Sequence, residues 1–326
     1  MTETAFYTVT GRDFFPGAVA LLNSLRLVGH AEPLFVLDSG MEPAQRALLE
    51  QHATIVPAPR DAPPSLLKLE APLTRGARTL VLLDADIIVT RPLTELIERA
   101  SQGFLVGFEN DRQRFFPEWA NLLGLEGLRR APYLSTSALF VDGALAETFM
   151  PLARQRQTSV DRRGTWLGRG SERHPLYYLD QDVLNAVVAS HLVADQVVAL
   201  DRRLSANPPF QGLRLLEPAS LRCTYRDGTD PYMLHHWSKK PWLVRMRSNV
   251  YSRLLTRLLL SSDVPLRLSA SDLPLRLRTG PAARAERAGI DIALLVPGMR
   301  RRLRRTPSVV TAWPDSRPVS DEGPGT

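Results

Sequence analysis

The sequence predicts an α/β fold for the main body of the chain, followed by a basic C-terminal extension. Three observations lead to this prediction. Short apolar or β-branched runs alternate with amphipathic helical stretches over the first 200 residues, which is typical of repeated βα units. The apolar run at residues 80–83 is bounded by charged residues, as expected of a central strand buried on both faces. The excess of basic residues is confined to the last quarter of the chain.

Local patterns predict the individual elements. Pro16 is well tolerated in a first helical turn, and Gly29 can end that helix. The predicted strands are residues 5–9, 34–37, 55–56, 80–83, 104–107, 138–141 and 197–199. The predicted helices are residues 16–29, 43–51, 182–190 and 247–260. Residues 161–174, rich in Arg, Gly and Ser, predict an exposed loop.

Composition limits the class of protein. Of 326 residues, 44% are hydrophobic, which suffices for a sizeable core. No apolar run approaches the roughly 18 residues of a membrane span, and the start lacks the pattern of a secretory signal. The lone cysteine, Cys223, excludes an intrachain disulfide and favours a small buried side chain in a reducing compartment. We therefore expect a cytoplasmic protein.

The charge divides the chain near residue 245. Residues 245–326 carry 15 arginines and 7 acidic residues, whereas residues 1–244 are nearly neutral. We expect a main domain at 1–245, a basic helical extension at 246–305, and a disordered tail at 306–326, where Pro, Ser and Gly are frequent. The arginine run at 300–305 could contact an anionic lipid surface at the inner membrane face, or could simply be solvated. It lacks interleaved aromatics, so no nucleic acid is expected as a partner.

Two carboxylates follow the predicted central strand. In Asp84-Ala85-Asp86 they stand between apolar runs, where they are costly unless a positive charge neutralises them. On an extended backbone, residues two apart point to the same side, so one cation could bridge both. Hard oxygen ligands favour Mg²⁺ or Mn²⁺. The alternative is a pair of ordinary acids at a strand end, capping a turn.

The segment at residues 83–89 resembles the DxD strand of the family-8 glycosyltransferases, which include glycogenins and bacterial lipooligosaccharide galactosyltransferases. Further similar segments recur in the same chain order from about residue 5 to 242. The resemblance implies a GT-A (Rossmann-like) nucleotide-diphospho-sugar transferase fold, with a mixed central sheet flanked by helices. It also implies retaining, metal-dependent transfer of a hexose-type sugar from a nucleotide diphosphate, with uridine favoured.

The same resemblance assigns residues to the donor. Those matching the contacts to the nucleoside are Thr8, Val9, Thr10 and, as an aromatic packing on the base, Phe15, for which a core position is the alternative. Lys68 matches a basic residue that reaches the diphosphate and the sugar. Ala85 lies between the two aspartates in the donor-binding set.

Two later segments match the sugar-binding side. Residues 133–138 stand where the family has an Asn-Ser-Gly turn, with Ser135 and Ser137 replacing the Asn and the Gly around Thr136, so the donor sugar stays open. Asp180 matches a residue that binds hydroxyls of the transferred sugar, and Gln181 matches one beside the reacting carbon. The alternative for Asp180 is a helix N-cap.

Residues 235–242 resemble the closing His…Lys-Pro-Trp segment of the family, although the spacing is about one residue shorter and a glycine is missing. The histidine would be the third metal ligand, and Lys240 would pair with the diphosphate. Because His235 and His236 alternate on an extended backbone, only one can face the cation. The preceding Met-Leu pair favours His235 and leaves His236 as the alternative.

The function predicted from the resemblance is sugar transfer to an unknown hydroxyl acceptor, which could be a glycan, a lipid-linked sugar, a protein or a small molecule. Gln181 in place of a nucleophilic carboxylate favours same-face substitution over a double displacement. A nucleotidyltransferase acting on sugar phosphates is the main alternative. It would normally have a glycine-rich phosphate loop near its start, and residues 10–15 of this chain offer only Gly11. A non-enzymatic nucleic-acid binder is a more distant alternative.

Overall fold

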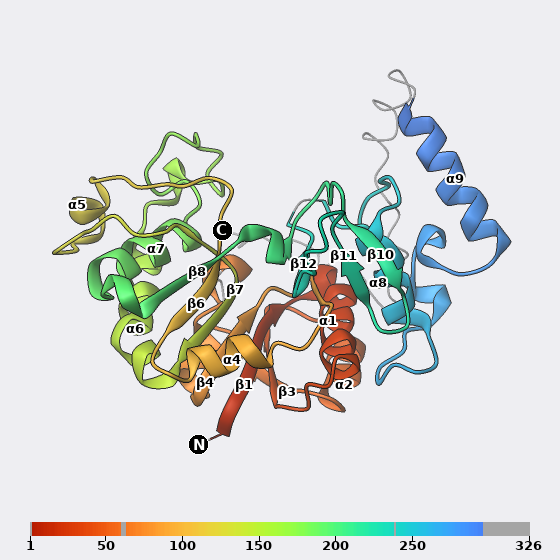
Figure 1. Cartoon of the computed structure of the whole chain (residues 1–326), viewed down its shortest axis with the longest axis horizontal. Coiled ribbons are helices and arrows are strands. Elements are labelled where there is room, and N and C mark those ends of the chain that lie inside the picture. Colours follow the sequence, from red (N-terminus) through yellow and green to blue (C-terminus); the bar gives the residue numbers. More distant parts are fainter. Residues whose placement is uncertain (1, 60–62, 238, 296–326) are drawn as a thin grey trace, which may run out of the picture.

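The computed structural model describes residues 2–59, 63–237 and 239–295, and its centre is a seven-stranded mixed sheet with helices on both faces (Figure 1). The strand order is β3-β2-β1-β4-β7-β6-β8. The first four strands in this order are mutually parallel, β7 is antiparallel to both β4 and β6, and β8 is parallel to β6. The strands are β1 (Thr2–Thr10), β2 (Leu34–Asp38), β3 (Thr54–Pro57), β4 (Ala77–Leu83), β6 (Leu105–Glu109), β7 (Leu134–Asp142) and β8 (Val197–Leu200). Each predicted strand overlaps one of them, which confirms the α/β prediction.

Side chains alternate between the two faces of this sheet. Phe6 and Val81 belong to the core on one face, whereas Tyr7 and Leu82 belong to the core on the other. The first face is covered by α1 (Phe15–Leu27), α4 (Thr94–Ala100) and α8 (Val250–Leu260). The second is covered by α3 (Glu70–Thr74), α5 (Trp119–Leu123), α6 (Gly143–Ser159) and α7 (Asp180–His191). Helix α2 (Pro43–Glu50) follows β2.

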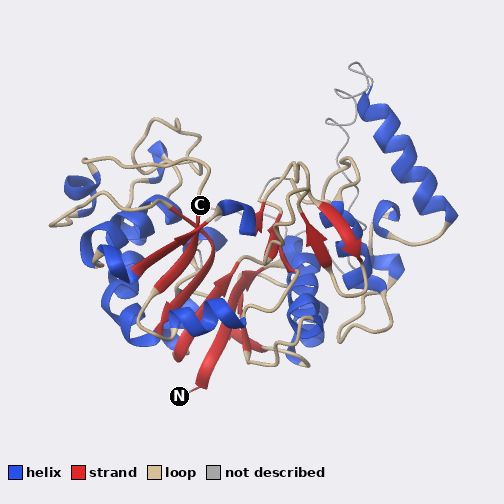
Figure 2. Cartoon of the chain, in the orientation of Figure 1, coloured by secondary structure: helices blue, strands red, loops and turns tan. Residues whose placement is uncertain are grey.

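A small second sheet lies beside the large one (Figure 2). It contains β5 (Ile87–Val89), β9 (Ser205–Ala206) and β12 (Met233–His235), in the order β5-β12-β9. The central β12 is antiparallel to β5 and parallel to β9. A separate hairpin joins β10 (Arg214–Glu217) and β11 (Arg222–Thr224). This second sheet was not predicted, because its strands are only two or three residues long.

Helix α6 is the longest element that sequence patterns missed. It runs for 17 residues with Pro151 inside it, and an internal proline normally argues against a helix. Asp142 caps its start by accepting a hydrogen bond from the Leu145 amide at 3.0 Å. Its apolar face, with Phe149 fully buried, packs on the sheet and on α7. Tertiary packing therefore stabilises a helix that local propensity disfavours.

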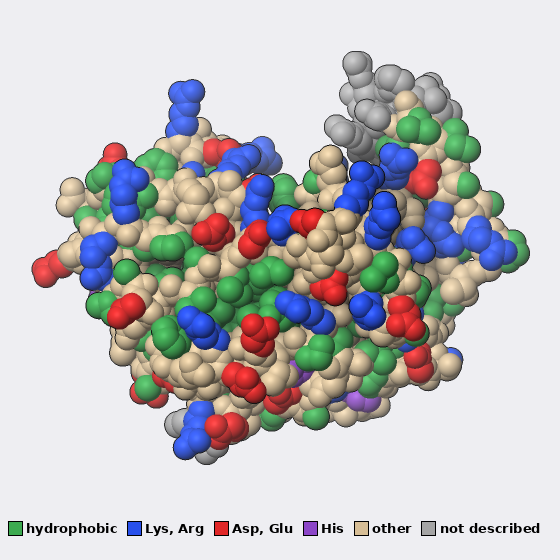
Figure 3. Space-filling view, in the orientation of Figure 1, with side chains coloured by type: hydrophobic (Ala, Val, Ile, Leu, Met, Phe, Trp, Pro, Cys, Tyr) green, Lys and Arg blue, Asp and Glu red, His purple; other side chains and the backbone are tan. Residues whose placement is uncertain are grey.

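The C-terminal part is joined to the main core. The Asn23 side chain in α1 donates hydrogen bonds at 2.7 Å to the carbonyl oxygens of Leu258 and Leu266, so α8 and the segment after it are fixed against α1. Helix α9 (Pro281–Leu295) begins at a proline, where the missing N–H costs nothing. It projects from the body at the upper right of Figure 1, and Figure 3 shows Lys and Arg side chains gathered beside it. The boundary at residue 245 stays a prediction.

The remaining sequence predictions concern the C-terminal tail, membrane-spanning helices and the single cysteine. The arginine run at 300–305 and the tail at 306–326 lie outside the described residues. Among the residues that are described, no helix has both the length and the apolar character that crossing a bilayer requires. Cys223 is buried, as predicted, and burial raises the pKa of its thiol to about 12.

Candidate active site

The two aspartates lie in a turn that connects the two sheets. Strand β4 ends at Leu83, and the Ile87 amide donates to the Asp84 carbonyl at 3.1 Å before the chain enters β5. The expectation of an extended backbone at 84–86 is therefore wrong. The side chains converge because the turn bends the chain, and not because of strand alternation. Asp86 is 5% exposed, whereas the Asp84 side chain is about a third exposed.

Helix α1 comes unusually close to this turn. A Cβ atom on Gly17 would lie 2.5 Å from the Ala85 carbonyl oxygen and 2.9 Å from the Trp242 ring. Backbone cannot yield as a flexible side chain can, so only glycine fits here. Gly17 thus allows α1 to support the turn that carries the carboxylates.

Replacing Gly17 with alanine is expected to shift this turn. The added methyl group must push Ala85 or Trp242 away by several tenths of an ångström. Because Ala85 lies between Asp84 and Asp86, this shift would move the two carboxylates and weaken the binding of a cation. We expect the affinity for Mn²⁺ and nucleotide, measured by calorimetry, to fall at least about tenfold. Gly76→Ala is the matched control, because a Cβ there meets nothing within 4 Å. Equal affinities in both variants would show that the close approach has no role in the site.

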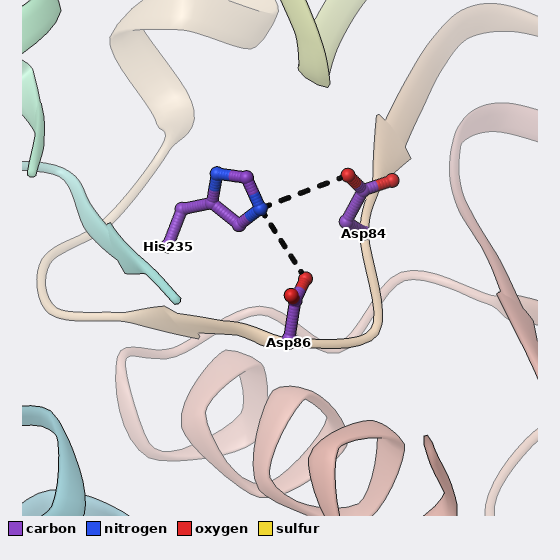
Figure 4. A group of neighbouring side chains, drawn as sticks. All are labelled: Asp84, Asp86 and His235. Carbon is purple, nitrogen blue, oxygen red and sulfur yellow. Dashed lines mark ion pairs between the residues drawn. The ribbon is translucent and has the colours of Figure 1, made fainter. Parts of the chain in front are cut away.

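His235 completes a three-residue group with the aspartates (Figure 4). Its Nε2 atom lies 3.4 Å from Asp86 Oδ1 and 3.8 Å from Asp84 Oδ2. The possible ligand atoms of the three residues all lie within 4.8 Å of one another. Strand pairing produces this proximity, since His235 in β12 is directly opposite Ile87 in β5.

The side chain of His236 lies among aromatic rings of the core. It is fully buried, with its ring near the rings of Phe210 and Tyr251. Among the described residues neither ring nitrogen has a hydrogen-bond partner, and burial, with the charge of Lys240, lowers the pKa of His236 to about 4. The geometry therefore favours His235 as the histidine that faces the carboxylates.

Two lysines lie against the carboxylates. Lys68 Nζ is 2.7 Å from Asp84 Oδ1 and donates a hydrogen bond to the Thr136 carbonyl at 2.6 Å. Burial alone would lower the pKa of Lys68, but the charges of Asp84 and Asp180 outweigh it, so the pKa is raised. This keeps the ammonium group charged at the site.

Lys240 occupies the equivalent position beside the second aspartate. It is 7% exposed, pairs with Asp86 and also donates to the His236 carbonyl. Burial opposes ionisation of Asp86, but His235 and Lys240 outweigh it and hold the pKa of Asp86 well below its usual range. The Tyr251 hydroxyl donates to the Asp86 carbonyl at 2.9 Å and further fixes this residue.

The N-terminus of α7 brings Asp180 and Gln181 to the same region. The amide of Gln181 is held at both ends, with Oε1 accepting from the Thr136 N–H at 3.3 Å and Nε2 donating to the Tyr133 hydroxyl at 3.1 Å. The Thr136 hydroxyl lies 3.5 Å from Asp180 Oδ2. Burial raises the pKa of Asp180 to about 6, an effect that Lys68 partly offsets.

The structure decides two points about this region. The alternative for Asp180, a helix N-cap, is wrong: Leu179 holds that position, with no side-chain cap, and Asp180 is the first helical residue. Residues 135–137, which stand where the family has a turn, belong to strand β7 here. Their hydroxyl groups pair with each other, since Ser135 Oγ and Ser137 Oγ are 2.9 Å apart.

A buried network behind α7 was not predicted. The guanidinium group of Arg114 donates twice to the fully buried Asp182 carboxylate, at 2.9 and 3.1 Å. Asp182 also accepts from the Tyr133 hydroxyl at 2.6 Å and from the Tyr178 amide at 2.7 Å. The network thus fixes Tyr133, which in turn orients the Gln181 amide. No local pattern could pair residues that are 68 positions apart.

The predicted nucleoside residues lie at the end of β1. Thr8 and Thr10 are buried and Val9 is half-buried; among the described groups the Thr8 hydroxyl has no hydrogen-bond partner. Phe15 is fully buried in the hydrophobic core, which was the alternative for it. Phe14 is instead 38% exposed, with Lys240 Nζ 5.5 Å from its ring centre.

Comparison of the whole structure identifies glycosyltransferases with the same fold. An active-site mutant of LgtC, in which a glutamine is replaced by glutamate, matches with a TM-score of 0.52 at 15% identity, over 82% of this chain and 98% of LgtC. WbbM, a bifunctional glycosyltransferase, matches with a TM-score of 0.54 at 13% identity, over 81% of this chain and 50% of WbbM. No protein-family model and no curated protein sequence matches the chain. The GT-A fold predicted from the resemblance is confirmed.

Proposed function

We propose that this chain, with its GT-A fold, is a retaining glycosyltransferase that moves a hexose from a UDP-sugar to a hydroxyl acceptor. The observation that carries the proposal is the convergence of Asp84, Asp86 and His235, whose ligand atoms lie within 4.8 Å of one another. Two carboxylates and an imidazole suit Mn²⁺ or Mg²⁺. When bound, such an ion stabilises the negative charge that develops on the leaving diphosphate.

The two lysines would share this task. Lys68 and Lys240 lie beside the carboxylates, and each carries donors that match phosphate oxygens. Both are largely buried, where a fixed positive charge acts more strongly than in water. Their role is to hold the diphosphate and to stabilise its departure.

The groups at α7 would act on the sugar. Asp180 would accept hydrogen bonds from its hydroxyl groups, while Gln181 would lie beside the anomeric carbon and stabilise an oxocarbenium-like state. LgtC also has a glutamine in its active site, which supports this role for Gln181. A glutamine is a poor nucleophile, so we favour same-face substitution, in which the leaving phosphate takes the proton of the acceptor hydroxyl.

The nucleoside would lie along the end of β1. The unpartnered Thr8 hydroxyl and the backbone of Val9 and Thr10 would contact the base. Phe14, and not Phe15, would be the aromatic residue that packs on the base, because Phe14 is exposed and close to Lys240. In this arrangement the nucleoside, diphosphate and sugar would extend from β1 past the aspartates to α7.

Donor-sugar binding should depend on pH through Asp180. Its pKa is raised to about 6, so the carboxylate that accepts hydroxyl hydrogen bonds forms only as the pH rises through that value. The ratio of affinities for UDP-sugar over UDP should increase between about pH 5 and pH 7, and taking the ratio cancels changes in metal binding. In Asp180→Asn the ratio should stay flat. A wild-type ratio that is equally flat would remove Asp180 from sugar binding.

The cellular location is also part of the proposal. We place the protein in the cytoplasm, with the basic residues 298–326 contacting anionic lipid at the inner membrane face. Sedimentation with phosphatidylglycerol-containing liposomes should carry down the full chain, but not a chain that ends at residue 297. Each basic residue near such a surface contributes about 1 kcal/mol. Equal sedimentation of both proteins would contradict lipid binding by this segment.

A further inference from the structure

A small cavity lies between the end of β5, the start of β12 and the β10–β11 hairpin (Figure 1). Its volume is about 280 Å³, and its charged lining consists of Arg91 after β5, Arg222 at the start of β11, and Asp230 before β12. Strands β5 and β12 are antiparallel, so this end of the pair is opposite the end that carries Asp86 and His235. The cavity is therefore separate from the candidate active site.

The two segments that meet at this cavity are fixed to each other. The Thr90 amide donates to the Tyr232 carbonyl at 2.9 Å, and the Thr90 hydroxyl donates to the Pro231 carbonyl at 2.8 Å. The guanidinium carbon of Arg91 lies 3.5 Å from the centre of the Tyr232 ring, whose hydroxyl group donates to Glu95. A guanidinium group that stacks on an aromatic ring keeps its N–H donors at the edge of its plane. Arg91 is thus oriented before any ligand binds.

The charged side chains of the cavity are not paired with one another. Within the described part of the chain, the side chains of Arg91, Arg222 and Asp230 form no hydrogen bond and no ion pair within 4.0 Å. Arg222 is exposed, so water can hydrate it. Arg91 is only half-exposed, and its Nε atom is buried without a partner among the described groups. A half-buried guanidinium group without an acceptor is costly, and an anion in the cavity would offset this cost.

We propose that this cavity binds a small phosphate monoester. Such a group carries a charge of about −1.5 to −2 at pH 7 and offers three acceptor oxygens, which match the forked donors of two arginines. Asp230 would accept a hydrogen bond from a hydroxyl group of the same ligand, and Val28 and Pro92 would contact its carbon atoms. A cavity of about 280 Å³ lies just below the range usual for drug-sized ligands, so it suits a triose or hexose phosphate better than a nucleotide sugar.

This site is independent of the proposed sugar transfer. None of its residues belongs to the candidate active site, so the phosphate monoester would bind whether or not the chain transfers a sugar. Calorimetry on the full chain, with chelator present to remove divalent cations, tests the site by itself. The probes are glucose 6-phosphate, glycerol 3-phosphate, inorganic phosphate and glucose.

Four variants locate the bound phosphate. Arg222→Ala removes an exposed side chain and should leave folding intact, and Arg91→Lys keeps the charge but loses the fork of donors. Arg214→Ala is the matched control, because Arg214 is exposed on β10 of the same hairpin but does not line the cavity. Lys68→Ala reports on phosphate that binds at the candidate active site instead.

We expect at least one ester to bind the wild type, Arg214→Ala and Lys68→Ala equally, and at least about fivefold more tightly than inorganic phosphate. Arg222→Ala and Arg91→Lys should each bind that ester about tenfold more weakly, and glucose should not bind. If neither ester binds, or if glucose binds as tightly, the phosphate assignment is wrong. Inorganic phosphate that binds as tightly as both esters would overturn the monoester assignment. Unchanged affinity in Arg222→Ala, or a loss confined to Lys68→Ala, would overturn the location.

Discussion

Replacing Asp84 and Asp86 together with asparagine is expected to reduce sugar transfer by at least about a thousandfold in kcat/KM. The two carboxylates provide two of the three groups that converge within 4.8 Å, and neutral amides cannot offset the charge of a divalent cation. Without that cation the departing diphosphate of the proposed reaction would lose its main stabilisation. Hydrolysis of a panel of nucleotide sugars, which needs no acceptor, measures the loss before the acceptor is known.

The single variants separate chemistry from folding. Asp86 is the partner of the buried Lys240, so Asp86→Asn leaves an unpaired buried charge and should cost about 3 kcal/mol of stability. Asp84→Asn should cost less stability, because the Asp84 side chain is about a third exposed, yet it should still impair activity strongly.

Asp201 and Asp227 offer a matched control for the double variant, since they flank Arg203 at the surface, and their double replacement should leave turnover intact. Equal activity in the control and the Asp84 and Asp86 double variant would refute the cation site.

Gln181→Ala is expected to lower kcat by about a hundredfold or more while changing the KM for donor by less than about threefold. The amide is held by the Thr136 N–H and the Tyr133 hydroxyl, so it is already oriented before the sugar reacts. A group that stabilises the transition state more than the ground state affects turnover and not binding.

Gln155→Ala is the matched control for this variant, because Gln155 is exposed on α6. Gln181→Asn should also be slow, since the shorter side chain cannot reach the same position. Unchanged turnover in Gln181→Ala would remove this residue from the mechanism. A raised KM with unchanged kcat would instead make it a binding residue only.

The sequence predicted the large sheet well, because most of its strands contain apolar runs between polar segments. Strand β4 is the clearest case, with an apolar run followed at once by the two aspartates. The chain order of the motifs was also sufficient to predict the fold that LgtC and WbbM share. These patterns involve residues that are close together in the sequence, so they can be recognised in a single sequence.

The remaining features depend on distant contacts. The aspartates face His235 only because β5 pairs with β12, and strands of three residues carry no periodic pattern. The choice between Phe14 and Phe15 depends on which ring the core buries, and adjacent identical residues cannot be told apart by type. The pairing of Asp182 with Arg114, which fixes Gln181 through Tyr133, also joins residues far apart in the sequence. Each of these required the folded structure.

In the proposed function, one divalent cation bound by Asp84, Asp86 and His235 would hold the donor diphosphate. Calorimetric titration of UDP into the protein, with Mn²⁺ and then with excess chelator, tests it most directly. We predict at least about a tenfold loss of UDP affinity on chelation, together with loss of the Mn²⁺ effect in Asp84→Asn. UDP affinity that is the same with Mn²⁺, with chelator and in Asp84→Asn would show that no cation at these residues holds the diphosphate.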